Sequence, residues 1–442
     1  MKRTLTRRGF LKAGGGALAG AYVLGLAACG GGGGEQGGTS KSLEFWGFDE
    51  GRVNFAKAGY KSEAFKSKHG DVEITFRILP YEQMHDKLLT ALVSGQGAPD
   101  IADIEISRFG QFIKGDRVPL LGLKERIGDA IDDIYRPAAV DPWSWKGEIY
   151  GLGNELNTVV MAYRRDILED AGVQLPFATW DDVIAAGQEI STGDRKMFAI
   201  HDLAWGDHYM MMQHAGTTYF DENGNYNGDD PRSIEAMQFL HDLVYKHEIA
   251  AIAPAEANDD WAPPQYLAAF RAERFIATFG PPWHLSYFID QVPDQSGKWD
   301  VQELPEGLGE SRPTANFGGT GMAITEQSGN PEASWALIEA GNLTKEGVLF
   351  DFEERTAYPA YKPAYEDPAL AQPNDYFGGV KIGQLYSDIA DDLPAFRQSP
   401  VWPDTTEAIE RDVITPVMND KADAETALTE MKGTVEDLQK EQ

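Results

Sequence analysis

LEFWGF, residues 43–48, has the apolar and aromatic composition of a β-strand. A stretch with helical spacing follows and ends at Gly70, and residues 72–78, VEITFRI, then alternate apolar and polar side chains as a second strand does. Residues 81–92 again have helical spacing, and residues 101–106, IADIEI, make a third strand. This β-α-β-α-β order predicts an α/β fold with a parallel sheet covered by helices.

Helix starts are marked farther along the chain by capping residues. Thr179 and Asp182 have the spacing of a capping box, and Asp230 and Asn330 each stand directly before a proline. A later helix is expected to kink near Pro416, because proline lacks the N–H that an α-helix needs. Helices are therefore expected as far as the end of the chain, and we find no internal repeat.

The N-terminal region has the features of an export signal. Two adjacent arginines at positions 7 and 8 precede a weakly apolar run, residues 13–28, which ends in the sequence Leu-Ala-Ala before Cys29. The run is too short and too rich in glycine to span a bilayer about 30 Å thick. We therefore expect residues 1–28 to be a twin-arginine lipoprotein signal peptide, removed before a lipidated Cys29. Residues 29–40 follow as a flexible glycine-rich linker.

Composition limits the classes of function. The 442 residues hold 39 basic and 70 acidic side chains, and five of the basic ones lie in residues 1–28, which leaves a formal charge of −36 beyond them. Nucleic acid is therefore not an expected partner, because binding phosphates needs a basic surface. Cys29 is the only cysteine, so no intramolecular disulfide can form.

Eight segments, in this order along the chain, resemble the extracellular sugar-binding proteins of ABC importers, the group that includes maltose-binding protein. They are FWGF (45–48), GQGAPDIADIEI (95–106), KGEIYG (146–151), YRRDILEDAGVQLPFATWDD (163–182), FRAERFIATFGPPW (270–283), ELPEG (303–307), GGTGMAI (318–324) and ETAL (425–428). The two arginines at 164 and 165 replace the Asn-Lys usual in the family. The resemblance covers nearly all of the chain after Ser40.

The resemblance implies a two-lobed, type II periplasmic-binding-protein fold with a hinge between the lobes. Lobe one would comprise residues 41–153 and 318–356, and lobe two residues 154–317 and 357–442. A ligand would bind in the cleft between them, and the lobes would close over it.

Sugar recognition needs aromatic faces that stack on a pyranose ring and polar groups that bond its hydroxyls. Trp283 is the first candidate, because it follows Gly280-Pro281-Pro282 and the resemblance places a stacking tryptophan after a Gly-Pro step. We expect Trp180 and Trp335 to be structural. The other candidate stacking residues are Trp402, Trp46, Trp205 and Trp261.

Polar candidates gather where strands end, because ligands of such sheets bind at the carboxyl ends of the strands. Asp103, Glu105 and Arg108 lie at the end of the third strand, where the resemblance implies sugar-binding side chains. The remaining candidates are Glu50, Glu155, Asp202, Arg355, Tyr358, Gly318 and Gly319.

These observations predict a lipoprotein that captures a carbohydrate outside the cytoplasmic membrane and delivers it to the permease subunits of an ABC transporter. We expect a monomer that is not an enzyme and has no catalytic residue, no cofactor and no metal. The same fold with a polyamine ligand remains an alternative because of the acidity, and a secreted glycoside hydrolase is another. A metal site at His201, His208 and His214 with Asp202 and Asp207 is a further alternative, although the spacing fits no single helix face.

Overall fold

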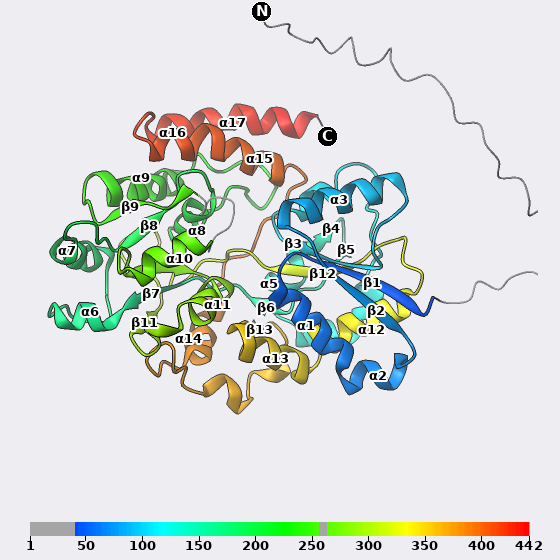
Figure 1. Ribbon diagram of the computed structural model, residues 1–442. Helices are drawn as coiled ribbons and strands as arrows, with labels where there is room; N and C mark the ends of the chain where they lie inside the picture. The colour runs from blue at the N-terminus through cyan, green and yellow to red at the C-terminus, as the bar shows by residue number, and fades with distance from the viewer. Residues whose placement is uncertain (1–39, 256–262, 442) are drawn as a thin grey trace, which may run out of the picture. The chain divides into compact units, whose positions relative to one another are not determined.

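The structure, a computed structural model, describes residues 40–255 and 263–441 (Figure 1). The expected signal peptide, the lipidated Cys29, the linker up to residue 39 and the candidate Trp261 lie outside the described residues.

The first sheet has four strands in the order β12-β3-β1-β2. The strands are β1 (Ser42–Gly47), β2 (Glu73–Ile78), β3 (Ile101–Glu105) and β12 (Thr320–Ile324). β1 pairs in parallel with β2 and β3, which confirms the parallel arrangement predicted from the sequence. β12 adds an antiparallel edge to β3, although residues 106–319 separate the two strands in the chain.

The first predicted helix is divided in two. α1 (Glu50–Lys61) ends where Ser62 adopts an extended backbone, and α2 (Glu63–His69) begins directly after it. The Ser62 hydroxyl accepts a hydrogen bond from the N–H of Phe65, so this residue caps the second helix.

Helices cover both faces of the first sheet (Figure 1). α3 (Tyr81–Ser94) buries Met84 and Leu88 in the same apolar cluster as Trp46 and Ile104. On the other face, α1 and α12 (Pro331–Asn342) pack against side chains such as Phe45. Alternate residues of each strand thus supply opposite faces, as expected for a sheet buried on both sides.

The second sheet has the order β10-β7-β11, with both pairings antiparallel. Its strands are β7 (Val160–Arg164), β10 (Ala277–Gly280) and β11 (Trp299–Gln302). A short parallel pair, β8 (Phe198–Ile200) and β9 (Ala250–Ile252), contacts β10 through β8. The helices that belong to this part are α7 (Trp180–Ile190), α8 (Gly206–His214), α9 (Pro231–Tyr245), α10 (Pro264–Arg271) and α11 (Pro282–Gln291).

The predicted caps are present. Thr179 and Asp182 form a reciprocal capping box at the start of α7, and Asp230 accepts from the N–H of Arg232 at the start of α9. Asn330 accepts from the N–H of Ala333 and so caps α12. Local sequence rules therefore place these helix starts correctly.

Three chain segments lie together where the chain passes from the first sheet to the second. β6 (Glu155–Leu156) pairs with β13 (Tyr358–Pro359), and Thr158 makes an isolated bridge to Asn316. β6 belongs to this passage, and the chain continues from it directly into β7.

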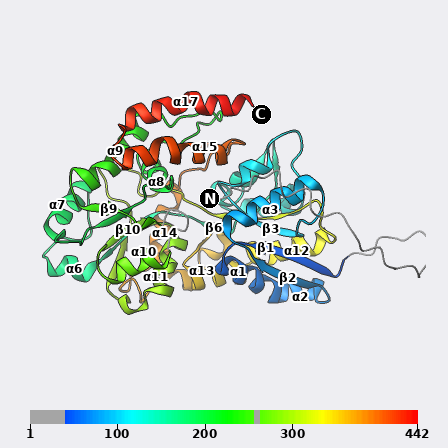
Figure 2. The same cartoon turned by 45° about the horizontal axis from the view of Figure 1, so that its top comes forward.

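The C-terminal helices pack on α9 and on one another (Figure 2). α15 (Trp402–Ile409) widens into a π turn, Glu410–Ile414, before α16 (Thr415–Met418), and α17 (Ala424–Lys440) packs on α15. The irregularity predicted near Pro416 is therefore a π turn before it, which fits the missing proline N–H. The remaining regular elements are α4 (Lys124–Ile127), α5 (Arg136–Ala139), β4 (Ser144–Trp145), β5 (Glu148–Ile149), α6 (Arg165–Asp170), α13 (Lys345–Arg355) and α14 (Ile382–Ile389).

Candidate functional site

A polar group stands at the carboxyl end of β3. The Glu105 carboxylate accepts hydrogen bonds from the Tyr81 hydroxyl at 2.9 Å and from the N–H of Ser107 at 2.8 Å. Arg108 forms an ion pair with Glu82, and its guanidinium carbon lies 5.3 Å from the centre of the Tyr81 ring. Glu105 and Arg108 are therefore brought together as predicted, with Tyr81 between them, a residue that sequence analysis did not single out.

Burial raises the pKa of Glu105, and the hydrogen bonds that it accepts from Ser107 and Tyr81 oppose this effect. The carboxylate is therefore held in place by donors while remaining partly exposed. A group in this state is suited to accept a hydrogen bond from a ligand hydroxyl.

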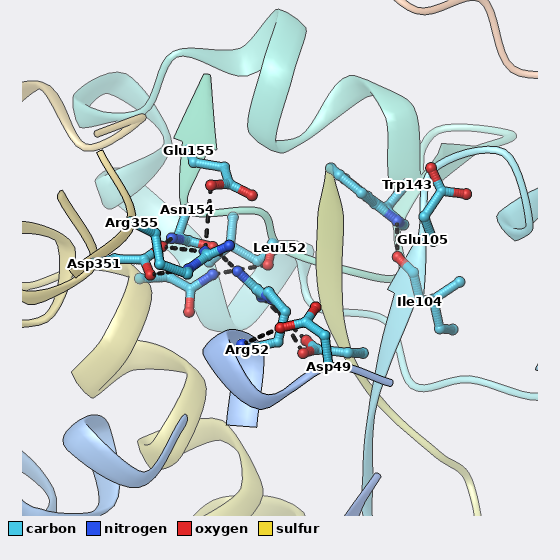
Figure 3. A network of polar contacts seen from close by, with 12 residues as sticks. Asp49, Arg52, Ile104, Glu105, Trp143, Leu152, Asn154, Glu155, Asp351 and Arg355 are labelled. Carbon is cyan, nitrogen blue, oxygen red and sulfur yellow. Dashed lines mark hydrogen bonds and ion pairs between the residues drawn. The ribbon is translucent and has the colours of Figure 1, made fainter. Parts of the chain in front are cut away.

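A buried network of charges lies beneath this edge (Figure 3). Arg52 pairs with Asp103 through two contacts of 3.1 and 3.2 Å, and donates from Nη1 to the Asn154 side-chain oxygen at 2.6 Å. Asn154 donates in turn to Asp351 at 2.6 Å, and Arg355 pairs with Asp351 at 2.7 Å. The network joins the first sheet to the passage between the sheets.

Four predicted ligand residues are structural in this conformation. Asp103 is 0% exposed because Arg52 occupies its carboxylate, and Glu155 is 3% exposed and lies 3.4 Å from Arg355. The Arg355 guanidinium forms an ion pair with Asp351, and the Tyr358 side chain, on β13, is buried. All four side chains are engaged by internal contacts in this conformation, and their direct contact with a ligand stays a prediction.

Three aromatic side chains form a row beside the passage. Trp205 and Trp283 are both partly exposed, and the buried Phe317 lies between them, with ring centres 5.3 Å from Trp205 and 5.9 Å from Trp283. We call Trp205, Phe317 and Trp283 the aromatic row. It combines two predicted residues with Phe317, which the sequence analysis missed because its neighbours are mostly small or polar.

Backbone geometry fixes the ring of Trp283. Its indole N–H donates to the Phe317 carbonyl at 3.2 Å, and a Cβ added at Gly318 would lie 2.8 Å from the same indole nitrogen. Gly318 and Gly319 have φ of +80° and +111°, and a Cβ at Gly319 would lie 2.6 Å from the Asn157 amide nitrogen. Both glycines are therefore needed for the passage to approach its neighbours. Their direct contact with a ligand stays a prediction.

Trp402 and Trp46 are buried rather than open to a ligand. Trp402 is 0% exposed and packs against the rings of Tyr209, Phe220 and Phe396. Trp46 is 2% exposed and faces α3, with the Lys87 ammonium 4.4 Å from its ring. Neither offers a free face in this conformation, and the role of these two residues as stacking platforms stays a prediction.

Two buried polar atoms beside the row have no hydrogen-bond partner among the described residues. They are the Tyr209 hydroxyl and the Trp402 indole N–H. Burial raises the pKa of Tyr209, and the charge of Glu105 adds to this effect, so the hydroxyl lies within electrostatic reach of the β3 edge. The two parts also meet where Gln398 donates from Nε2 to the carbonyls of Ile106 and Pro142.

The remaining predicted residues lie apart from this group. Glu50 is exposed in the first turn of α1. Asp202 accepts a hydrogen bond from Asn419 at 3.4 Å, on the side of the C-terminal helices.

The histidines of the alternative metal site are bound to separate partners. His201 contacts Asp207 at 2.9 Å, His208 contacts Tyr219 and the Ser233 carbonyl, and His214 contacts the Trp180 indole. Within residues 40–255 and 263–441, no three His, Cys, Asp or Glu side chains are grouped as a metal ion would need.

His208 gives a test of stability against pH. Burial lowers its pKa to about 4, so between pH 6.5 and about 4 the unfolded chain binds a proton that the folded chain does not. Its contribution to stability is complete above pH 6.5 and is lost as the pH falls through this window. In a His208→Gln variant, the dependence of unfolding free energy on pH should be shallower by up to about 1.4 kcal/mol per pH unit. Urea denaturation at pH 4.5, 5.5 and 6.5 measures it, and equal slopes in both proteins would contradict it.

Residues 53–344 match the family described as bacterial extracellular solute-binding protein. This chain belongs to that family. A curated relative of the solute-binding protein, the arabinooligosaccharide-binding protein of Halalkalibacterium halodurans, is 29% identical over 89% of this chain and 88% of that one. The protein of the same description from Bacillus subtilis is 28% identical over 79% of this chain and 81% of that one.

Solved structures show the fold of this solute-binding protein. An ABC transporter associated binding protein from B. animalis subsp. lactis, in complex with β-1,6-galactobiose, has a TM-score of 0.75 at 21% identity over 91% of this chain and 98% of that chain. Maltose-bound MalE3 of T. maritima has a TM-score of 0.73 at 19% identity, over 90% of this chain and 99% of that chain. The predicted type II, two-lobed fold is thereby confirmed.

Membership of an extracellular family indicates that the solute-binding protein works outside the cytoplasm. In the part of the chain that the structure describes, no helix combines the length and apolar character needed to cross a membrane.

Proposed function

We propose that this solute-binding protein captures an oligosaccharide and delivers it to the permease of an ABC importer. The aromatic row carries the proposal, because it presents two partly exposed indoles held apart by a buried ring. Partly exposed indoles suit the C–H faces of sugar rings, and Glu105 supplies an acceptor for hydroxyls. No covalent chemistry is required of these groups.

The relatives support a neutral sugar as the ligand. Two curated relatives that cover most of the chain are named for arabinooligosaccharides, and the related structures hold galactobiose and maltose. The acidity of the chain does not by itself favour a polyamine, because much of it lies on solvated surface.

The lobes that we propose follow the two sheets. Residues 41–153 and 318–356 would form lobe one around the four-stranded sheet, and residues 154–317 and 357–442 would form lobe two. The segments that meet at β6 and β13 would form the hinge. Ligand would bind between the lobes of a monomer and favour their closed arrangement.

A binding panel tests the function. Arabinotriose, β-1,6-galactobiose, maltotriose and spermidine are each titrated into the purified protein by calorimetry, and thermal shifts are recorded in parallel. We expect one of the saccharides to bind with a Kd of about 1 µM, about −8 kcal/mol, and to be recovered unchanged. Binding of spermidine alone, or cleavage of a saccharide by the pure protein, would overturn the proposal.

Membrane attachment is tested separately at Cys29. We propose that a lipoprotein signal peptidase cuts before Cys29 and that its sulfur carries a diacylglycerol, with further acylation giving a stable anchor. Cells fed labelled fatty acid should label the wild-type chain, and Cys29→Ser should abolish the label and release the protein. Replacing both Arg7 and Arg8 with lysine should leave the chain unexported if a twin-arginine pathway carries it. A Cys29→Ser chain that still takes up the label would refute the lipid site.

A further inference from the structure

Glu410 occupies an irregular point of the C-terminal helices. It is the first residue of the π turn that follows α15, and Thr415 donates from its hydroxyl to the Glu410 carbonyl at 2.7 Å. π turns inside helices are often found at functional sites. In Figures 1 and 2, α15 lies on the side of the second sheet's helices that is nearest to α3.

The Glu410 carboxylate stands at one end of the aromatic row. Its Oε1 accepts the backbone N–H of Trp205 at 3.3 Å, directly before α8. Of the residues that the structure describes, none donates to its second carboxylate oxygen. The Glu410 side chain is partly exposed, as is Trp205, so both are open to a group that approaches from solvent.

A polar partner is also missing on the other side of Trp205. The Trp402 ring lies 5.9 Å from the Trp205 ring, and its fully buried indole N–H finds no acceptor within the described part of the chain. Buried donors are normally satisfied, so a partner that is not a protein group is indicated here. Because Trp402 is 0% exposed, a bound water, rather than the sugar itself, has the chemistry to serve this donor.

Charges from both parts of the protein act on Glu410. Burial raises its pKa to about 7, against the effects of the Trp205 N–H and of Arg108 from the end of β3. Glu82 on α3 and Glu407 on α15 raise the pKa further. Near neutral pH the carboxyl therefore exchanges between a form that only accepts hydrogen bonds and a form that also donates one.

We propose that Glu410 hydrogen-bonds the captured sugar and makes its affinity depend on pH across the neutral range. This inference rests on the proposed function, since it assumes a sugar on the aromatic row. A sugar over Trp205 removes the remaining water from the carboxyl and favours its protonated form. The affinity for the sugar is therefore highest below pH 7 and falls as the pH rises above 7. The fall is up to about tenfold for each unit by which sugar binding raises the pKa of Glu410.

Calorimetric titration of the full chain with arabinotriose at pH 6.0, 7.0 and 8.5 tests the inference. Affinity of the wild type should fall at least threefold from pH 6.0 to 8.5. Glu410→Gln carries a donor and an acceptor at every pH, so it should keep affinity at pH 8.5 and lose the dependence. Glu425→Gln removes an exposed carboxyl in the first turn of α17, and it is the matched control that should behave as the wild type.

Thermal melts of each variant at the three pH values establish that the compared proteins are folded. A wild-type affinity that does not change with pH, or a Glu410→Gln variant that keeps the full dependence, would overturn the inference and leave the proposed function standing. No binding of any panel sugar by the wild type at any pH would instead overturn the proposed function, and this inference with it.

Discussion

An Asp103→Ala variant is expected to lose about 3–5 kcal/mol of folding free energy, because it removes the anion from a buried ion pair. Arg52 and Asp103 are 1% and 0% exposed, and the pair is joined by two contacts of 3.1 and 3.2 Å. Among the described residues, the Arg52 guanidinium would then donate to the Asn154 amide oxygen alone. Denaturation by guanidinium chloride, monitored by tryptophan fluorescence, measures the loss.

A second variant separates charge from packing. Replacing Arg52 with methionine and Asp103 with leucine together removes both charges, and should restore most of the stability that the single variant loses. Lys68→Ala, which breaks an exposed pair with Glu339, should change the stability little. A loss below about 1 kcal/mol in Asp103→Ala, the typical value for exposed pairs, would show that Arg52 reaches water.

The second large effect concerns ligand affinity. Trp283→Ala should weaken sugar binding at least tenfold, about 1.4 kcal/mol, because it removes one end of the aromatic row. The indole is held by the Phe317 carbonyl and by the close approach of Gly318, so the ring is already placed before the ligand arrives. Little ordering of this side chain then offsets its contact with the sugar.

The matched control is Trp145, another partly exposed tryptophan, which lies in the β4–β5 pair. Trp145→Ala should leave affinity unchanged, while Trp283→Ala should unfold at nearly the temperature of the wild type. Unchanged affinity in Trp283→Ala by calorimetry would remove this residue from the binding site.

Much of the fold follows from local patterns. The alternation in residues 72–78 and the caps at Thr179 and Asp230 depend on neighbouring residues alone, and the structure agrees with both. The break at Ser62 was missed because a serine within helical spacing fits both a helix interior and a cap. The place of β12 beside β3 depends on pairing between distant segments, which strand propensity does not encode.

The site was harder to predict because residue type does not reveal burial. Trp402 and Trp283 both stand near prolines in apolar surroundings, yet only Trp283 is partly exposed. Asp103 and Glu105 are two residues apart in one strand. The Asp103 carboxylate is buried and paired with Arg52, while the Glu105 side chain is partly exposed. Glu410 gave no signal among 70 acidic side chains, since its distinction arises only from its contact with Trp205.

The antiparallel edge formed by β12 has a consequence for synthesis. During synthesis, β1, β2 and β3 leave the ribosome before residues 320–324 are made. The edge of β3 therefore stays unpaired while all strands of the second sheet are synthesised. Exposed strand edges recruit other chains, which makes this interval the vulnerable one for the nascent protein. A chain stopped before residue 320 should therefore aggregate, and supplying the missing strand as a peptide should restore solubility.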